Sequence, residues 1–489
     1  MKSEENNRIK VFRHAIIVTV NPERDVYFDG AIVVDGEKIS DVGSDESVIA
    51  SMFVKGMLDE EGKPVVEGVE VINCEGKALF PGFISTHNHL YQSLLKGLGD
   101  DMVLSEWLET MTFPASSYIT PEDTYYAAMI GLLDGIHSGI TTQLDYMYPH
   151  PIGALTDPII EAFLELGVRG VLARGGMDTG SEFGVDSRIM QKPEGVEKDL
   201  VRLFEKYHLK YGDQMRIWTA PAALWSNTEE MLEMLWEITQ HFKTGFSCHI
   251  SETPFDRESV CKKHGMGELE FLERKNMTGP NVMLVHSVYL TPEDIDKAAY
   301  YNMSVSHNTA SNMYLSSGVA PVPTMLEKGV TVSLGLDGAA SNNGQDMLEL
   351  MKLTALLHKV DSLDPTIISA EKVLEMATIE GARSLGMGDK IGSLESGKYA
   401  DIVVFNPNLA AKAVPMHNPV STLVYSSTEI NIEQVLISGK NVLLDGVVQT
   451  ISDEPKILAE AQKVAEGLAS RAGITNRRER HKWNDKYRW

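Results

Sequence analysis

Two histidines, His87 and His89, stand one residue apart at the end of an apolar run, "ISTHNH". In a β-strand, residues i and i+2 project from the same face, so both imidazoles are expected to point the same way. Imidazole nitrogen is a common ligand of Zn2+ and Fe2+, and two such rings on one face can bind a single ion. The pattern therefore predicts a metal site that begins at this strand end.

Further candidate ligands follow other apolar runs. "CHISE" contains His249 and Glu252, "VHS" contains His286, and "GLDGAAS" contains Asp337. His249 and Asp337 complete, with the first two histidines, a set of three imidazoles and one carboxylate that leaves a position for water. We expect one divalent metal ion per subunit, with Zn2+ as the preferred ion and Fe2+ as the alternative.

These residue types suggest a hydrolytic reaction. A bound divalent ion lowers the pKa of its water toward neutrality. Asp337 is expected to accept the proton of that water, and Glu252, three residues beyond His249, to protonate a ring nitrogen of the substrate. His286 is predicted to orient the water and to stabilise charge on the substrate, while direct ligation of the ion stays open.

The candidate residues need a scaffold that brings distant strand ends together. From residue 79 onward, apolar runs alternate with segments of helical periodicity. Eight strands with helical crossovers predict an α/β fold, a (β/α)8 TIM barrel with its catalytic groups at the C-terminal strand ends. The predicted strands cover residues 79–86, 139–145, 169–176, 216–223, 245–250, 282–287, 303–308 and 330–337.

The two ends of the chain have a different residue pattern from the barrel segment. Residues 10–76 and 392–450 contain short alternating stretches separated by turn signals, and they predict one small β-sandwich domain built from both ends. Residues 77–391 form the predicted metal-dependent barrel, and residues 451–489 form a closing C-terminal helix over 455–472 and a basic tail.

Composition excludes several classes of partner. A formal charge of −25 over 489 residues repels phosphate backbones, so nucleic acid and anionic membrane are unexpected partners. No apolar run approaches the ~18–20 residues that span a bilayer. The polar N-terminus lacks the apolar core of a secretory signal, which predicts a cytoplasmic protein.

The basic tail "NRRERHKWNDKYRW" is expected to be solvated or to pack on a neighbouring subunit of a homodimer or larger homo-oligomer.

Three segments resemble the amidohydrolase superfamily, in the branch of the methylthioadenosine/S-adenosylhomocysteine deaminases and the s-triazine hydrolases. The matching segments are residues 81–108, 311–343 and 374–406, and the similarity extends over about residues 10–450. The resemblance implies displacement of ammonia, an amine or chloride from an electron-poor aromatic carbon. It implies metal ligation by His87, His89, His249 and Asp337 and proton transfer by Glu252. It also implies a single ion, because the bridging lysine of binuclear members is absent from "RIWTAPAA".

Two departures from the nucleoside deaminases disfavour a sugar-bearing substrate. The segment that supplies a ribose-binding glutamate in those enzymes reads "FPAS" here, with Ser116 in its place, and Ala222 stands where they have a histidine. Gln92 matches the triazine-type enzymes. A flat, mostly apolar ring pocket is predicted, with substrate contacts from the catalytic candidates Glu252 and His286. The further candidates are Tyr91, Gln92, Trp107, Phe113, Ser116, Leu224, Trp225, Asn308 and Ser341.

The leading hypothesis is a metal-dependent aminohydrolase that acts on a small N-heterocycle of the triazine, pyrimidine or purine type. An s-triazine chlorohydrolase is the first alternative, because both reactions use the same metal-site residues. A methylthioadenosine/S-adenosylhomocysteine-type nucleoside deaminase is the second. A metal-free scaffold protein is the non-enzyme alternative, and metal analysis of the purified protein would distinguish it.

Overall fold

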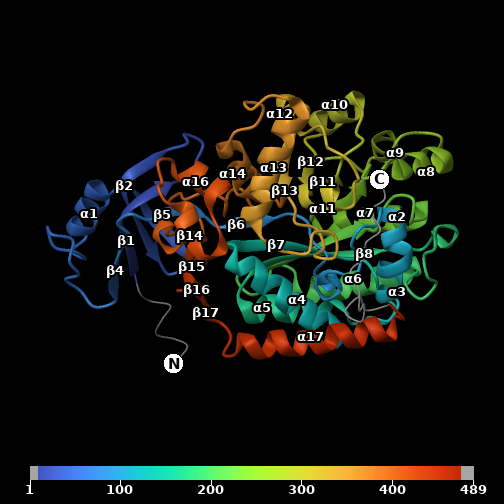
Figure 1. The fold of residues 1–489 in the computed structure, drawn as a ribbon, viewed down its shortest axis with the longest axis horizontal. Coiled ribbons are helices and arrows are strands. Elements are labelled where there is room, and N and C mark those ends of the chain that lie inside the picture. The colour runs from blue at the N-terminus through green and yellow to red at the C-terminus, as the bar shows by residue number, and fades with distance from the viewer. Residues whose placement is uncertain (1–8, 475–489) are drawn as a thin grey trace.

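Two β-sheets organise the chain. The computed structural model describes residues 9–474, with a parallel sheet of eight strands and a mixed sheet of nine. In Figure 1 the mixed sheet lies at the left, where blue strands from the N-terminal part and orange to red strands from the C-terminal part lie side by side. The parallel sheet and its helices occupy the remainder of the view.

The parallel sheet confirms the predicted barrel. Its strands follow chain order from β6 to β13, and the amide of Thr86 donates to the carbonyl of Leu334 at 2.9 Å, which joins the first and last strand ends. All eight predicted strands overlap an observed one. The strands are β6 (Phe83–Ser85), β7 (Ile140–Met147), β8 (Arg169–Gly176), β9 (Met215–Pro221), β10 (Phe246–Ile250), β11 (Val282–His286), β12 (Ser304–His307) and β13 (Thr331–Leu334).

Helices cover the outer face of the barrel, so β7 and β8 are buried along their whole length. The main helices are α4 (Pro121–His137), α5 (Thr156–Leu166), α6 (Pro193–Tyr207), α7 (Glu229–Phe242), α8 (Pro254–His264), α9 (Glu268–Arg274), α10 (Pro292–Tyr300), α11 (Thr309–Tyr314), α12 (Val322–Glu327), α13 (Met347–Ser362), α14 (Ala370–Ala377) and α15 (Ile379–Ser384). The β6–α4 connection adds the short helices η2 (Leu90–Leu95), α2 (Leu104–Trp107), η3 (Leu108–Thr112) and α3 (Phe113–Ser116).

A repeated tetrapeptide starts three of these helices. The sequence Thr-Pro-x-Asp occurs at residues 120–123, 253–256 and 291–294, and each copy forms a capping box. In α4 the Thr120 amide donates to Asp123 Oδ2 at 2.7 Å, and proline occupies the first helical position. Because the second copy follows β10 directly, it fixes the chain immediately after Glu252 at the strand end.

The mixed sheet joins the two ends of the chain. Its order is β17-β16-β15-β14-β5-β1-β2-β3, with β4 beside β1, and the antiparallel pair β5 and β14 connects the halves. The strands are β1 (Ile9–Val18), β2 (Val26–Asp35), β3 (Lys38–Ser44), β4 (Val69–Asn73), β5 (Ala78–Pro81), β14 (Ile402–Phe405), β15 (Ile432–Ile437), β16 (Lys440–Leu444) and β17 (Val447–Val448). The helices α1 (Asp45–Val54) and α16 (Pro419–Ser426) belong to the same chain ends.

Only Gly82 separates β5 of the mixed sheet from β6 of the barrel. The predicted domain boundaries at residues 76/77 and 391/392 stay a prediction. The C-terminal helix α17 (Glu454–Arg471) lies along α4, as the long red helix of Figure 1 shows. The predicted basic tail lies outside the described residues.

A buried ion pair connects the two sheets. Arg169 on β8 lies 3.4 Å from Asp401 beside β14, and both side chains are almost fully buried. The same guanidinium donates to Ser438 Oγ at 2.8 Å, and the amide of Ser438 donates to Asp401 Oδ1 at 2.7 Å. The carbonyl of Asp401 accepts the amide of Gly82 at 2.9 Å. This cluster therefore fixes the point at which the chain passes between the sheets.

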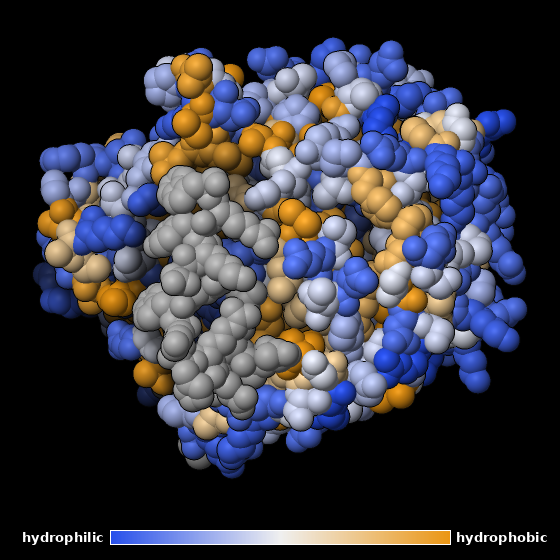
Figure 2. Space-filling model, turned by 45° about the vertical axis from the view of Figure 1, so that its right-hand side comes forward, coloured by the Kyte–Doolittle hydropathy of each residue, from blue (hydrophilic) through white to orange (hydrophobic). Residues whose placement is uncertain are grey.

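The surface shown in Figure 2 is largely hydrophilic, with its hydrophobic residues in scattered areas. Within residues 9–474, the helices are all too short or too polar to cross a lipid bilayer.

We predict that Asp401→Ala destabilises the fold strongly, because it leaves the buried Arg169 guanidinium without its counter-charge. Loss of one partner from a buried pair costs about 3–5 kcal/mol. The effect is measured as a lower midpoint of urea unfolding. As a control, Glu460→Ala removes the exposed pair with Lys463 and should change stability by less than about 1 kcal/mol. Equal effects of the two variants would contradict the assigned importance of the buried pair.

Candidate metal centre and active site

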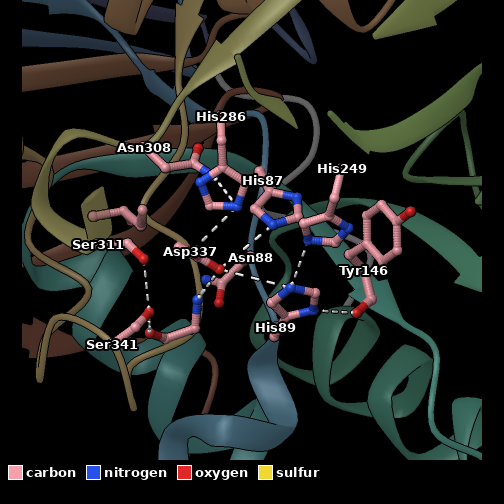
Figure 3. A network of polar contacts seen from close by, with 12 residues as sticks. His87, Asn88, His89, Tyr146, His249, His286, Asn308, Ser311, Asp337 and Ser341 are labelled. Carbon is pink, nitrogen blue, oxygen red and sulfur yellow. Dashed lines mark hydrogen bonds and ion pairs between the residues drawn. The ribbon is translucent and has the colours of Figure 1, made fainter. Parts of the chain in front are cut away.

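Five side chains from four strand ends converge at the C-terminal rim of the barrel. His87 and His89 follow β6, His249 lies on β10, His286 ends β11, and Asp337 follows β13. Figure 3 shows their polar atoms pointing toward one shared space. Four of the five residues are buried, and His249 is half-buried. The predicted strand-end residues are thus brought together in space.

The separations between these atoms match those of ligands around one ion. His89 Nε2 lies 3.2 Å from His249 Nε2 and 3.6 Å from Asp337 Oδ1, and His87 Nε2 lies 3.4 Å from the same oxygen. Ligand atoms that surround Zn2+ tetrahedrally at the usual bond length lie roughly 3.3–3.4 Å apart. These separations suit shared ligation of one ion, and two overlapping groups, His87/His89/His249 and His87/His286/Asp337, could each hold one.

Backbone carbonyls fix the tautomers of two of the imidazoles. His89 Nδ1 lies 2.6 Å from the carbonyl of Tyr146, and His249 Nδ1 lies 2.7 Å from the carbonyl of Ala222. A carbonyl only accepts, so Nδ1 carries the proton in both rings and each Nε2 presents a lone pair. Burial, together with His87, lowers the pKa of His89 to about 3, so the ring is neutral. Two lone pairs that face each other repel, and a cation between them removes that repulsion.

His87 supports the same conclusion. It is fully buried, and neither of its ring nitrogens has a hydrogen-bond partner among the described residues. A buried polar atom without a partner is costly, so such an atom calls for a ligand. The donor set of three imidazoles and one carboxylate therefore fits a bound metal ion.

The backbone is strained where two of these residues leave their strands. His286 has a φ of 67° and Asp337 a φ of 63°, in the left-handed region that non-glycine residues seldom occupy. The amide of Asp337 donates to the carbonyl of His87 at 3.0 Å, which holds this conformation. Such strain is common at functional sites, where the surrounding structure enforces it.

A second pair of groups lies beside the metal-binding set. Glu252 Oε2 is 3.5 Å from His286 Nε2, and His286 Nδ1 donates to Asn312 Oδ1 at 2.9 Å. Burial raises the pKa of Glu252 to about 7. Burial opposes the charged form of His286, but Glu252 and Asp337 outweigh it and raise its pKa. Glu252 can therefore carry a proton near neutrality.

Asp337 differs from Glu252 in protonation. Burial favours the neutral carboxyl, but His87 and the neighbouring imidazoles outweigh burial and hold the pKa of Asp337 well below its usual value. One carboxylate of the site is thus an anion suited to a cation, while the other is a proton carrier.

The sequence matches a known family over most of its length. The model of the amidohydrolase family matches residues 78–442. The chain belongs to this family.

Relatives within the amidohydrolase family are named as deaminases. A 5-methylthioadenosine/S-adenosylhomocysteine deaminase of Syntrophomonas wolfei is 35% identical over 87% of this chain and 94% of its own length. A 5'-deoxyadenosine deaminase of Methanobrevibacter smithii is 31% identical over 90% of this chain and 94% of its own. Among solved structures, atrazine chlorohydrolase from Arthrobacter aurescens TC1 complexed with zinc superposes with a TM-score of 0.84 at 26% identity, covering 93% of this chain and 100% of that one.

The candidate metal ligands of this amidohydrolase lie beside a pocket with mainly apolar walls. Trp107 and Trp225 line it, and their indole N–H groups are used elsewhere, on the carbonyl of Ala340 and on Asp256. Neither indole N–H is therefore free to bind a ligand, so both rings contribute apolar surface to the pocket. The remaining walls include Leu104, Leu108, Phe113, Tyr148, Met177, Ala222, Ala223, Ser226, Leu315 and Ser341.

The predicted substrate contacts fall into two groups. Those that line the pocket are Gln92, Trp107, Phe113, Trp225, Glu252, His286 and Ser341. The others lie behind this lining. Ser116 Oγ donates to the hydroxyl of Tyr91 at 3.3 Å, Asn308 Nδ2 lies 3.4 Å from His286 Nδ1, and Leu224 is fully buried.

Several residues of the site were missed by the sequence reasoning, among them Asn312, which accepts a hydrogen bond from His286 Nδ1. Tyr146 supplies the carbonyl that orients His89, and Tyr148 lines the pocket. Both follow the strand-face alternation of β7 and could have been found from the spacing in "LDYMY". Asp256 also lines the pocket, but its sequence signal is a helix capping box, which concealed its second contact with Trp225.

We predict that Glu252→Gln reduces the pH dependence of stability in the metal-free protein. The pKa of Glu252 is raised from 4.5 to about 7 on folding, so the stability contributed by its protonated form is present below pH 4.5 and lost as the pH rises to about 7. The measurement compares thermal midpoints at pH 5 and pH 8. The exposed Glu230→Gln variant on α7 is the control and should retain the wild-type dependence. An unchanged pH dependence in Glu252→Gln would contradict the burial of this carboxyl.

Proposed function

We propose that the protein is a metal-dependent aminohydrolase that uses water to displace ammonia or an amine from an amino-substituted N-heterocycle. The observation that carries this proposal is the convergence of four metal-donor side chains, with three donor pairs at 3.2–3.6 Å, beside a carboxyl whose pKa is about 7. Both lie in a pocket lined by aromatic and aliphatic side chains. The names of the curated relatives are consistent with deamination.

We assign the metal-binding role to His87, His89, His249 and Asp337, with one divalent ion per subunit. Zn2+ is the preferred ion, supported by the zinc in the similar atrazine chlorohydrolase structure, and Fe2+ is the alternative. When bound, the ion makes water acidic enough to attack at neutral pH. The strand β9, which would carry a bridging lysine in a binuclear site, contains no lysine.

Three side chains accept or deliver the protons of the proposed reaction, or stabilise the charge that develops. Asp337 is an anion that accepts the proton of the attacking water. Glu252 delivers a proton to the ring nitrogen beside the reacting carbon, and a second transfer protonates the leaving amine. His286, oriented by Asn312, donates from Nε2 toward Glu252 and Asp337 and stabilises negative charge that develops in their vicinity. Ammonia requires this protonation before it leaves, whereas chloride does not.

The pocket favours a flat ring as the substrate. Trp107 and Trp225 present ring faces, and Gln92 has a buried carbonyl oxygen with no partner among the described residues. Ser341 adds a hydroxyl to the lining. We assign Ser116 to the support of Tyr91, to whose hydroxyl it donates, and we place Asn308 behind the pocket lining beside His286.

A nucleoside deaminase is the second candidate function. Both curated relatives act, by their names, on adenine nucleosides, and they are more similar in sequence than the chlorohydrolase is. Ser116 and Ala222 replace the polar residues that bind the sugar in the nucleoside deaminases. This disfavours a nucleoside substrate, because a site built to bind sugar hydroxyls loses affinity when polar partners are missing.

The homo-oligomeric state and the cytoplasmic location stay predictions.

The test is a screen for ammonia release from aminopyrimidines, aminotriazines, pterins, purines and their nucleosides, with chloride release from chlorotriazines measured in parallel. We expect ammonia from at least one aminoheterocycle, loss of this activity after chelation, and its return with Zn2+ or Fe2+. Chloride release without ammonia release would replace the proposal with a chlorohydrolase. A protein that binds no metal and releases neither product would be a scaffold.

We predict that Asp337→Asn lowers kcat/KM by about 10²–10⁴-fold or more, because the variant cannot accept the proton. The fold should be retained, since asparagine is isosteric and tolerates the left-handed backbone at this position. Initial rates and circular dichroism measure the two effects. The exposed Asp361→Asn variant on α13 is the matched control and should keep wild-type activity. Near-normal activity in Asp337→Asn would remove the assigned role.

A further inference from the structure

Three buried amide side chains form a cluster next to the candidate metal ligands. They belong to Asn88, to Gln143 on β7 and to Gln345, which lies shortly before α13, and all three are fully buried. Gln345 Oε1 accepts from Gln143 Nε2 at 3.0 Å and also from Asn88 Nδ2. Gln345 Nε2 donates to the carbonyl of Asp337 at 3.0 Å. One side chain therefore connects β7 with the segments that follow β6 and β13.

The carbonyl of Asp337 fixes the orientation of this amide cluster. A carbonyl only accepts, so the Gln345 atom that faces it is the Nε2 donor, and Oε1 must face the other two amides. Those amides present their nitrogen atoms to it, which leaves Asn88 Oδ1 and Gln143 Oε1 buried without a partner among the described residues. Unpaired buried acceptors are costly, so the arrangement calls for a reason beyond stability.

Asp337 is held at both ends of its backbone. Its amide donates to the carbonyl of His87 at 3.0 Å, and its carbonyl accepts from Gln345. The residue has a φ of 63°, and surrounding contacts must enforce such a conformation. In this conformation the carboxylate lies 3.4 Å from His87 Nε2 and 3.6 Å from His89 Nε2. Loss of the Gln345 contact would free the peptide group after Asp337 and with it the position of the carboxylate.

The amide cluster also contacts the segment that carries the first two histidines. Asn88 is the residue between His87 and His89, and its side chain binds Gln345. Gln345 is itself anchored, because its backbone amide donates to Asp134 Oδ2 on α4 at 3.1 Å. One anchored side chain therefore sets the separation between the histidine pair and Asp337.

We propose that Gln345 is a positioning residue that sets the metal affinity of the site. It holds the Asp337 carbonyl and the Asn88 amide at a fixed separation, so the carboxylate and both imidazoles are in place before an ion binds. This inference rests on the proposed function, because it requires that the site binds a metal. Loss of a residue that orients metal ligands typically lowers metal affinity by about 10–100-fold.

The test measures Zn2+ affinity of the full-length chain after its metal has been removed with a chelator. A chromophoric chelator that competes for Zn2+ gives the Kd, and the thermal midpoint of the metal-free protein is recorded in parallel. Gln345→Met replaces the amide with an apolar side chain of similar size. We expect this variant to bind Zn2+ at least about tenfold more weakly than the wild type.

Two further variants separate positioning from packing. Gln345→Asn keeps an amide, but its shorter side chain cannot reach Asp337 and Asn88 together, so it should weaken Zn2+ binding to a similar extent. It decides the question if Gln345→Met fails to fold. Gln143→Met removes one hydrogen bond to Gln345 but leaves the Asp337 carbonyl bonded, and it should weaken Zn2+ binding by less than about threefold.

Gln434→Met is the matched control. Gln434 lies on β15 of the mixed sheet, is 5% exposed and donates to Asn441 Oδ1 at 2.8 Å, so this variant also removes a buried bond between two amides. It should lower the thermal midpoint of the metal-free protein and keep the wild-type Zn2+ affinity. A purely structural role of Gln345 predicts the same behaviour for Gln345→Met.

Wild-type Zn2+ affinity in a folded Gln345 variant would overturn the inference, and so would equal weakening in that variant and in Gln143→Met. Ammonia release is measured in the same samples. Zn2+ binding that depends on Gln345, without ammonia from any heterocycle, would refute the aminohydrolase while the positioning role stands. Ammonia release with Zn2+ affinity unchanged by the Gln345 variants would refute the positioning role alone. A wild-type protein that binds no Zn2+ would refute both.

Discussion

The site depends on a single electrostatic constraint: neutral imidazole lone pairs are held face to face in a buried space. The carbonyls of Tyr146 and Ala222 take the Nδ1 protons of His89 and His249, which leaves the two Nε2 atoms opposed at 3.2 Å. Hydrogen bonds between residues cannot relieve this opposition, because no proton lies between the atoms. A cation can, so the backbone of β7 and the end of β9 determine what the barrel rim binds.

The same burial produces two carboxyl groups with opposite behaviour. Asp337 is desolvated, but its interactions with His87 and with His286, whose own pKa is raised, outweigh this desolvation and hold the pKa of Asp337 low. Glu252 is buried beside His286 but lacks such a surrounding, so desolvation dominates and its pKa rises to about 7. Hydrolysis of a C–N bond needs both a permanent anion and a proton carrier, and this pair supplies them within one small pocket.

The barrel brings these groups together, and the mixed sheet fixes the position of the first barrel strand. Residues on β6, β10, β11 and β13 meet because all parallel strands end at the same rim. The first of these strands begins one residue after the mixed sheet, where Asp401 binds both the Gly82 amide and the Arg169 guanidinium. The position of His87 and His89 is thereby set from both sheets.

The sequence alone predicted the barrel, the joining of the two chain ends, and the strand-end residues that the structure brings together at one rim. These follow from local periodicity and from the rule that strand ends share a rim, so spacing was sufficient. Only the tertiary structure decided the tautomers of His89 and His249, the raised pKa of Glu252, and which predicted contacts reach the pocket. Ser116 and Asn308 illustrate the difference, since each lies near the site in sequence-based reasoning but points at another side chain in space. Burial and hydrogen-bond direction depend on contacts between residues far apart in the chain, and no local pattern of residue types specifies them.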